Sequence, residues 1–234
     1  MTDAMIRMKG VTLDLGRRRI LESIDLEIAP GESVGLIGPN GSGKTSILRC
    51  LLGLVPFRGS ASIDGHDVVR DPIDARRRIA FLPQRASFGD ALAGEHLAFV
   101  AKLRGLDRVR ERVESALAQV GLADQAKRRA RDFSGGMQQR LSLACVILVD
   151  APVLLLDEPT ASLDREGQTH FLRVVESLRA EGRTLVLASH RPEEVARLTD
   201  RVIVMDRGVI DLKADRLDSP ANVVVPLFSP RVLQ

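Results

Sequence analysis

The chain of 234 residues contains no tryptophan and no tyrosine, and phenylalanine occurs only 7 times. Recognition of a ligand by stacking on Tyr or Trp is therefore excluded. Apolar runs such as residues 146–149 and 153–156 stay far below the roughly 20 residues of a membrane-spanning helix. Residues 1–4 include an acidic residue and begin no apolar segment of a signal peptide. We therefore expect a cytoplasmic chain, and any membrane part must come from other chains.

Cysteine and net charge are also scarce. The two cysteines, Cys50 and Cys145, lie in apolar patterns of helical spacing, which favours buried reduced thiols over a disulfide or a metal site. Lys and Arg number 34 against 31 Asp and Glu, and the net charge of +3 is too small to indicate a nucleic-acid partner. With 44% hydrophobic and 28% charged residues, the composition is that of an ordinary folded protein.

The most informative segment is a glycine-rich turn between a short apolar strand at residues 33–37 and a helical pattern at residues 46–52. The turn matches the pattern G-x-x-x-x-G-K-T. Backbone N–H groups of such a turn surround phosphate oxygens, and the following helix adds its partial positive charge. We predict a nucleotide phosphate site made by Gly38, Pro39, Asn40, Gly41, Ser42, Gly43, Lys44, Thr45 and the adjoining Ser46.

Two side chains of this turn have predicted chemical roles. Lys44 is expected to reach the β- and γ-phosphates, and the hydroxyl of Thr45 to ligate Mg²⁺. A nucleoside triphosphate and Mg²⁺ are thus the expected ligands.

A second group of polar residues follows other predicted strands. The apolar run at residues 153–156 ends in Asp157 and Glu158, and parallel sheets bind ligands at the carboxyl ends of their strands. We predict that Asp157 holds Mg²⁺ through a water and that Glu158 orients and polarises the attacking water. Gln84, after the strand at residues 78–82, is expected to contact Mg²⁺ or that water, and His190, after residues 184–189, the γ-phosphate.

The order of patterns predicts an α/β fold, a P-loop NTPase core with a mainly parallel sheet. The alternating pattern of residues 5–28 predicts an antiparallel hairpin with one solvent-exposed face and with residues 16–19 in its turn. Residues 88–135 hold amphipathic helices and no strand pattern, so we predict an inserted helical subdomain within a domain of residues 1–213. Residues 214–234 contain three prolines and form either a loosely ordered tail or an extended segment packed on the domain or a partner.

Residues 133–140, which read FSGGMQQR, resemble the signature segment of ATP-binding cassette (ABC) ATPases. The phosphate loop, Gln84, the signature, the strand ending at Asp157, the loop at residues 161–164 and His190 follow one another in the family's order, and the resemblance covers about residues 5–212. It implies a head-to-tail pair of subunits with ATP at their interface. It also extends the ATP-binding set to Ser134, Gly135, Gly136, Met137 and Asp164. Taken alone, Ser134 could equally be an ordinary helix cap.

The chain departs from the family pattern at three positions. Phe133 and Met137 stand where the signature usually has Leu and Gln, while the phosphate-facing Ser134 and Gly136 are kept. Leu15 stands where the family usually has an aromatic residue that stacks on adenine. The resemblance therefore implies ordinary phosphate chemistry with weak stacking on the base.

A single phosphate loop without a membrane span resembles the ATPase subunits that work with separate membrane permeases, and residues 82–106 resemble exporter ATPases encoded apart from their permease. We expect such a subunit on the inner face of the cell membrane, with residues 85–104 gripping a cytoplasmic helix of the permease. Within this segment, Leu97 and Phe99 are expected in the core of the subdomain. Two alternatives stay open: a membrane-associated ABC ATPase driving lipoprotein release or cell-wall remodelling, and a soluble ABC ATPase acting on nucleic acid or ribosomes.

Overall fold

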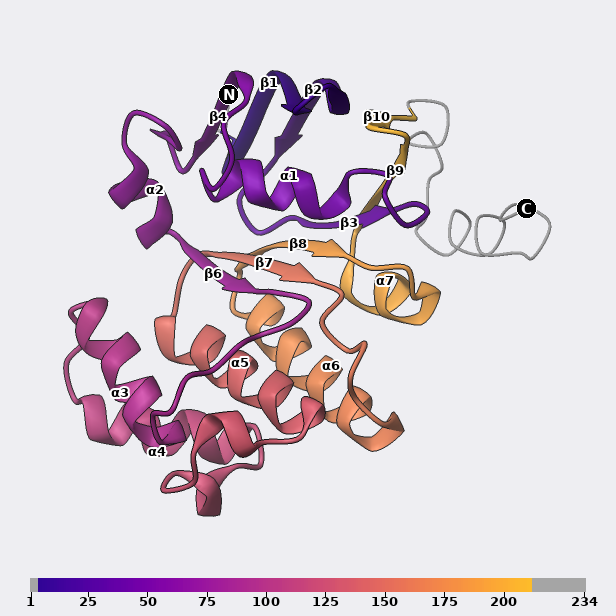
Figure 1. The fold of residues 1–234 in the computed structure, drawn as a ribbon. Coiled ribbons are helices and arrows are strands. Elements are labelled where there is room, and N and C mark those ends of the chain that lie inside the picture. The colour runs from indigo at the N-terminus through magenta and orange to yellow at the C-terminus, as the bar shows by residue number, and fades with distance from the viewer. Residues whose placement is uncertain (1–3, 212–234) are drawn as a thin grey trace.

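The computed structural model describes residues 4–211, and its centre is a six-stranded sheet in the order β10-β9-β3-β8-β7-β6 (Figure 1). The strands are β3 (Ser33–Ile37), β6 (Ile79–Leu82), β7 (Val153–Asp157), β8 (Thr184–Ala188), β9 (Arg201–Asp206) and β10 (Val209–Ile210). All neighbours pair in parallel except β9 and β10, which are antiparallel. The predicted α/β class with a mainly parallel sheet is confirmed.

A second, antiparallel sheet has the order β2-β1-β4-β5 and is built from β1 (Ile6–Leu15), β2 (Arg18–Ile28), β4 (Arg58–Ile63) and β5 (His66–Asp67). The β1–β2 hairpin is tighter than predicted, because only Gly16 and Arg17 remain in its turn, while Arg18 and Arg19 pair in β2. Helix α1 (Lys44–Leu51) lies between the two sheets (Figure 1).

The other face of the central sheet is covered by α5 (Gly135–Val149) and α6 (Arg165–Ala180), with α7 (Pro192–Leu198) beside them (Figure 1). Between β6 and α5 the chain forms α3 (Ala93–Leu103), α4 (Val109–Gln119) and two short 3₁₀ turns at Ala123–Gln125 and Ala130–Asp132. The limits of a subdomain at residues 88–135 stay a prediction, and the tail at residues 214–234 lies outside the described residues.

Helix α2 (Pro72–Arg77) was not predicted from the sequence. Six residues are too few to show helical periodicity, so the available indications were Pro72 at the first helical position and Asp74 in the first turn. In the described part of the chain no helix combines the length and the apolar character needed to cross a bilayer.

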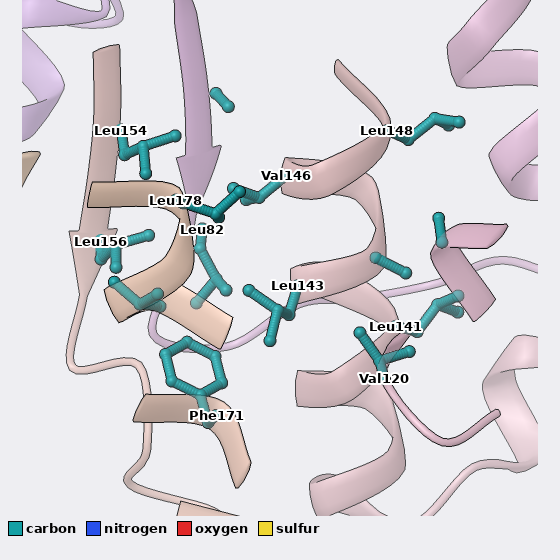
Figure 2. Packing of buried hydrophobic residues seen from close by; sticks show 14 of the residues in the cluster. Leu82, Val120, Leu141, Leu143, Val146, Leu148, Leu154, Leu156, Phe171 and Leu178 are labelled. Atoms are coloured by element: carbon teal, nitrogen blue, oxygen red, sulfur yellow. The ribbon is translucent and has the colours of Figure 1, made fainter. Parts of the chain in front are cut away.

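The strands of the central sheet are buried on both faces, which is why they read as continuous apolar runs. Leu154 and Leu156 of β7 pack on the side of α5 and α6, whereas Val153 and Leu155 pack on the side of α1. Figure 2 shows Phe171 of α6 on the α5–α6 side, near Leu156 and Leu143. Two hydrophobic cores therefore hold the sheet in place between its helices.

Helix α3 corrects one sequence prediction. Ala93, Leu97 and Ala101 recur every four residues and are fully buried, as predicted for Leu97. Phe99 was expected in the same core, but it is 64% exposed, because two residues along a helix turn a side chain to the opposite face. Leu103, one turn further on, is 74% exposed on that outer face.

Both cysteines are free thiols, Cys50 buried in α1 and Cys145 partly buried in α5. Burial raises the pKa of each thiol to about 12. At neutral pH both are therefore unreactive thiols, in line with the sequence prediction.

Phe171 in the core and Phe99 on the outer face of α3 test how the helices pack. Phe171→Ala should lower the free energy of unfolding by about 3–5 kcal/mol, because the side chain is 1% exposed and its removal leaves a cavity. Phe99→Ala, the matched control, should change it by no more than about 0.5 kcal/mol. Urea unfolding followed by circular dichroism measures both, and equal losses would contradict the assignment of Phe99 to the outer face.

Candidate active site

The phosphate loop joins β3 to α1 and depends on glycine at two positions. Gly43 has φ 109°, and a Cβ there would lie 2.7 Å from Cδ2 of Leu21. Gly38 has φ 149°, and a Cβ would collide with the carbonyl oxygen of Met205. Only glycine avoids both the left-handed strain and the collisions at these two positions.

Lys44 and Ser42 place polar atoms within this loop. Nζ of Lys44 donates to the carbonyl oxygens of Gly38 and Pro39 at 2.8 and 3.2 Å, although the residue is only 7% exposed. Burial lowers the pKa of Lys44, and the charges of Glu158 and Asp157 oppose that shift. Within residues 4–211, Oγ of Ser42 is buried and has no hydrogen-bond partner. An anion bound in the loop would satisfy both groups.

Thr45 connects the phosphate loop to the end of β7. Its hydroxyl donates to Oδ1 of Asp157 at 3.0 Å. Burial raises the pKa of Asp157, the Thr45 hydrogen bond opposes the shift, and the neighbouring charge of Glu158 adds to it. A hydroxyl and a carboxylate side by side are oxygen ligands of the kind that Mg²⁺ takes, so these residues fit the metal that ATP hydrolysis requires.

Glu158 and His190 form a pair at the ends of neighbouring strands. Oε2 of Glu158 lies 2.6 Å from Nδ1 of His190, and the Glu158 side chain is 9% exposed against 53% for His190. Glu158 has φ 45°, a left-handed conformation that costs a non-glycine residue about 1–2 kcal/mol. Strain of this kind is kept where the surrounding structure enforces it, often at functional sites.

The structure brings nine of the predicted site residues together in one cleft of about 440 Å³. The cleft is lined by Asn40, Gly41, Gly43, Lys44, Thr45, Ser46, Gln84, Glu158 and Leu15, together with Arg18 and Ile20. Sequence reasoning missed Arg18 and Ile20, because it placed Arg18 in the hairpin turn. The basic run at residues 17–19 was the indication that could have found Arg18.

The signature residues lie elsewhere. A cleft of about 970 Å³ is lined by Ser134, Gly135, Gly136, Met137 and Asp164 and shares no residue with the first cleft. Oγ of Ser134 accepts from the Met137 N–H at 3.3 Å and caps α5, and Oδ1 of Asp164 accepts from the Gly167 N–H at 2.8 Å and caps α6. Within one chain, therefore, the residues predicted to bind ATP fall into two separate groups.

Comparison with known proteins was made with this geometry in hand. A family model described as ABC transporter matches residues 21–161, which include the phosphate loop, Gln84, the signature and Glu158. The chain is 37% identical to the daunorubicin resistance ATP-binding protein DrrA3 of Streptomyces coeruleorubidus, over 93% of this chain and 74% of that protein. Other resistance ATP-binding relatives are matched over 63–67% of their length.

A relative with a different named role is almost as similar. The hemin import ATP-binding protein HmuV of Pseudomonas entomophila is 36% identical over 95% of this chain and 89% of its own length. Among solved structures, a dimeric ATP-binding cassette in a post-hydrolysis state, bound to ADP and phosphate, has a TM-score of 0.80 and 25% identity, over 88% of this chain and 97% of that chain.

Leu15, the residue predicted to lie against the adenine base, lines the first cleft. Leu15 is 49% exposed there and offers area burial but no aromatic face. Leu15→Tyr should tighten ATP binding by about five- to a hundredfold, since stacking on a base is worth ~1–3 kcal/mol, and kcat should hardly change. Arg17→Tyr, in the hairpin turn outside the cleft lining, is the control.

We expect unmodified protein to bind ATP and GTP within about tenfold of each other. Strong selectivity for ATP would show that another residue holds the base.

Proposed function

The chain belongs to the ABC transporter family and is an ATP-binding and ATP-hydrolysing subunit, and we propose that it energises export by a separate membrane permease. The observation that carries the mechanism is the separation of the two clefts. One cleft holds the phosphate loop and Glu158, which contacts His190, and the other presents the capped N-termini of α5 and α6 to solvent. Each cleft therefore has only part of the groups expected around a nucleoside triphosphate: the phosphate loop in one, and the helix N-termini in the other.

We infer that two chains combine head to tail, so that each phosphate loop faces the signature segment of the other chain. Ser134 and Gly136 at the start of α5 supply a hydroxyl, backbone N–H groups and the positive end of a helix, all suited to a γ-phosphate. Ser134 and Gly135 are exposed in the single chain. The dimeric cassette bound to ADP and phosphate supports this arrangement by its similarity in fold and sequence.

The proposed chemistry is in-line attack of water on the γ-phosphorus. The oxygen–phosphorus bond to water forms while the bond to the β-phosphate oxygen breaks, and ADP leaves with that electron pair. Glu158 orients the water and takes its proton, and Lys44 stabilises the charge on the phosphate oxygens. Thr45 and Asp157 would hold Mg²⁺, and that ion would supply positive charge to offset the charge of the phosphate oxygens.

His190 and Gln84 complete the proposed site. Because Nδ1 of His190 faces Glu158, Nε2 is the ring nitrogen that can reach a phosphate oxygen. Gln84 lines the same cleft just after β6, where it can contact the attacking water or the metal. The contacts of both residues would therefore depend on whether the γ-phosphate is present.

We propose that the outer face of α3 receives a cytoplasmic helix of the permease. Phe99 and Leu103 are exposed there, at a spacing that forms one apolar stripe. Arg104, just after α3, donates to the carbonyl oxygens of Arg76, Arg77 and Ile79 at 3.0, 3.2 and 2.9 Å. Since Ile79 begins β6 and Gln84 follows its end, a displacement of α3 is linked mechanically to the γ-phosphate site.

We propose export as the direction because the resistance relative is named for a drug, and removal of a drug from the cell produces resistance. The similar hemin import relative shows that the ATPase chain alone is compatible with either direction. This is consistent with a permease that selects the substrate and an ATPase chain that supplies the energy.

Glu158→Gln tests the proposed catalytic role. It should bind ATP with Mg²⁺ but hydrolyse it at least ~10²-fold more slowly, because the amide cannot accept the proton of water. The retained ATP should hold two chains together, which sedimentation with ATP and with ADP would detect. Near-normal turnover in this variant would remove Glu158 from the catalytic role.

The double variant Glu158→Gln with Ser134→Arg tests the composite site. Arginine in the second cleft would occupy the space of the other chain's γ-phosphate, so the ATP-dependent dimer should disappear. ATP binding to the single chain should be unchanged, because Ser134 does not line the phosphate-loop cleft. A dimer as stable as that of the single variant would contradict the head-to-tail arrangement.

Site-directed cross-linking tests the permease contact. Cysteines at Ser87 and Phe99 should cross-link to the membrane protein that co-purifies with the chain, whereas a cysteine at the exposed Arg110 of α4 should not. The native thiols should not interfere, because burial raises the pKa of each to about 12. Cross-links formed only from Arg110 would overturn the proposed surface.

A further inference from the structure

Glu194 of α7 is a buried carboxylate that none of the roles above uses. It is 3% exposed, while its neighbour Glu193 on the same short helix is exposed. A charged carboxyl group is seldom buried to this extent unless its oxygens have partners. The hydrogen-bond partners of Glu194 therefore indicate its role.

Both oxygens of Glu194 accept hydrogen bonds from hydroxyl groups. Oε1 accepts from Oγ1 of Thr160, and Oε2 accepts from Oγ of Ser189 at 2.8 Å. Thr160 and Ser189 are both 0% exposed, so water cannot replace the carboxylate as their partner without opening the structure. Arg191 contributes a weaker charge contact, with Nε 3.6 Å from Oε1.

The two hydroxyl groups belong to the two segments that carry the Glu158–His190 pair. Thr160 is two residues after Glu158, whose backbone is held in the left-handed conformation at φ 45°. Ser189 immediately precedes His190, and its Oγ also accepts from the Arg191 N–H at 3.0 Å. One carboxylate thus joins the end of the β7 segment to the end of the β8 segment.

Two other contacts hold the same turn. The Glu158 N–H donates to the carbonyl oxygen of Ala188 at 2.8 Å, and Nε2 of Gln139 in α5 donates to the carbonyl oxygen of Pro159 at 2.7 Å. These two bonds fix the backbone on either side of the Glu158–Pro159 peptide. Among these contacts, the Glu194 carboxylate alone bonds the side chains that follow Glu158 and precede His190.

We propose that Glu194 is a positioning residue for ATP hydrolysis, a buried carboxylate that holds Thr160 and Ser189 so that Glu158 and His190 keep their relative placement. The inference rests on the proposed catalytic role of Glu158. Glu194 does not line the phosphate-loop cleft, so its contribution is to the chemical step and not to nucleotide binding. A purely structural role would instead lower stability and binding together.

The test compares Glu194→Ala with Glu194→Gln and with the exposed neighbour Glu193→Ala. Glu194→Ala should lower kcat by on the order of 10²-fold, the usual effect of a displaced catalytic group, while Kd for ATP with Mg²⁺ stays within about twofold. Glu194→Gln keeps an oxygen that accepts from one hydroxyl and presents an N–H group that can donate to the oxygen of the other, so it should stay within about threefold of wild type in kcat. Glu193→Ala should match wild type.

Ser189→Ala supplies a second route if Glu194→Ala does not fold. It removes one of the two bonds with little change in volume, and it should lower kcat by about tenfold with unchanged Kd for ATP. Turnover of Glu194→Ala or Ser189→Ala near that of wild type would overturn the proposal. An equal decrease of kcat in Glu194→Gln and Glu194→Ala would also overturn the proposal. A decrease in ATP affinity as large as the decrease in kcat would do the same. Absence of ATPase activity in the wild type, or normal turnover by Glu158→Gln, would instead count against the proposed function.

Discussion

The parallel pairing of β3, β8 and β7 is the constraint from which the site follows. Because these three strands run in the same direction as neighbours, their carboxyl ends meet at one edge of the sheet. The phosphate loop follows β3, Glu158 follows β7 and His190 follows β8. Thr45 and Asp157, 112 positions apart, thus come within hydrogen-bond distance, as do Glu158 and His190, 32 positions apart. The two hydrophobic cores on either side of the sheet hold that register.

The same geometry is the reason for proposing that a second chain completes the site. Helices α5 and α6 cover the face of the sheet opposite α1, and their capped N-termini open into a cleft that shares no residue with the phosphate-loop cleft. A rigid domain cannot bring the two clefts together without breaking the core around Leu143 and Phe171. In the proposed head-to-tail pair, the phosphate-loop cleft of each chain faces the signature cleft of the other.

Much of this could be predicted from the sequence, because the informative residues follow the ends of apolar runs. The strands at residues 33–37 and 153–157 and their polar ends were recognisable, since a strand buried on both faces reads as a continuous apolar segment. Phe99 was predicted wrongly, because hydrophobicity does not by itself tell which face of a helix a residue occupies. The contacts of Glu194 and the left-handed backbone of Glu158 have no pattern in the sequence, since both depend on side chains that meet only in the folded chain.

Electrostatics gives a physical reason for proposing that nucleotide enters this site together with a cation. Asp157, Glu158 and Glu194 are all buried near one another, and the charge of Glu158 raises the pKa of both other carboxyl groups, after the larger effect of burial. Lys44 is the buried cation facing Asp157 and Glu158 in the described chain. A bare triphosphate would bring several more negative charges into this low-dielectric region. A divalent cation, which Asp157 and Thr45 would hold, would supply positive charge that offsets them.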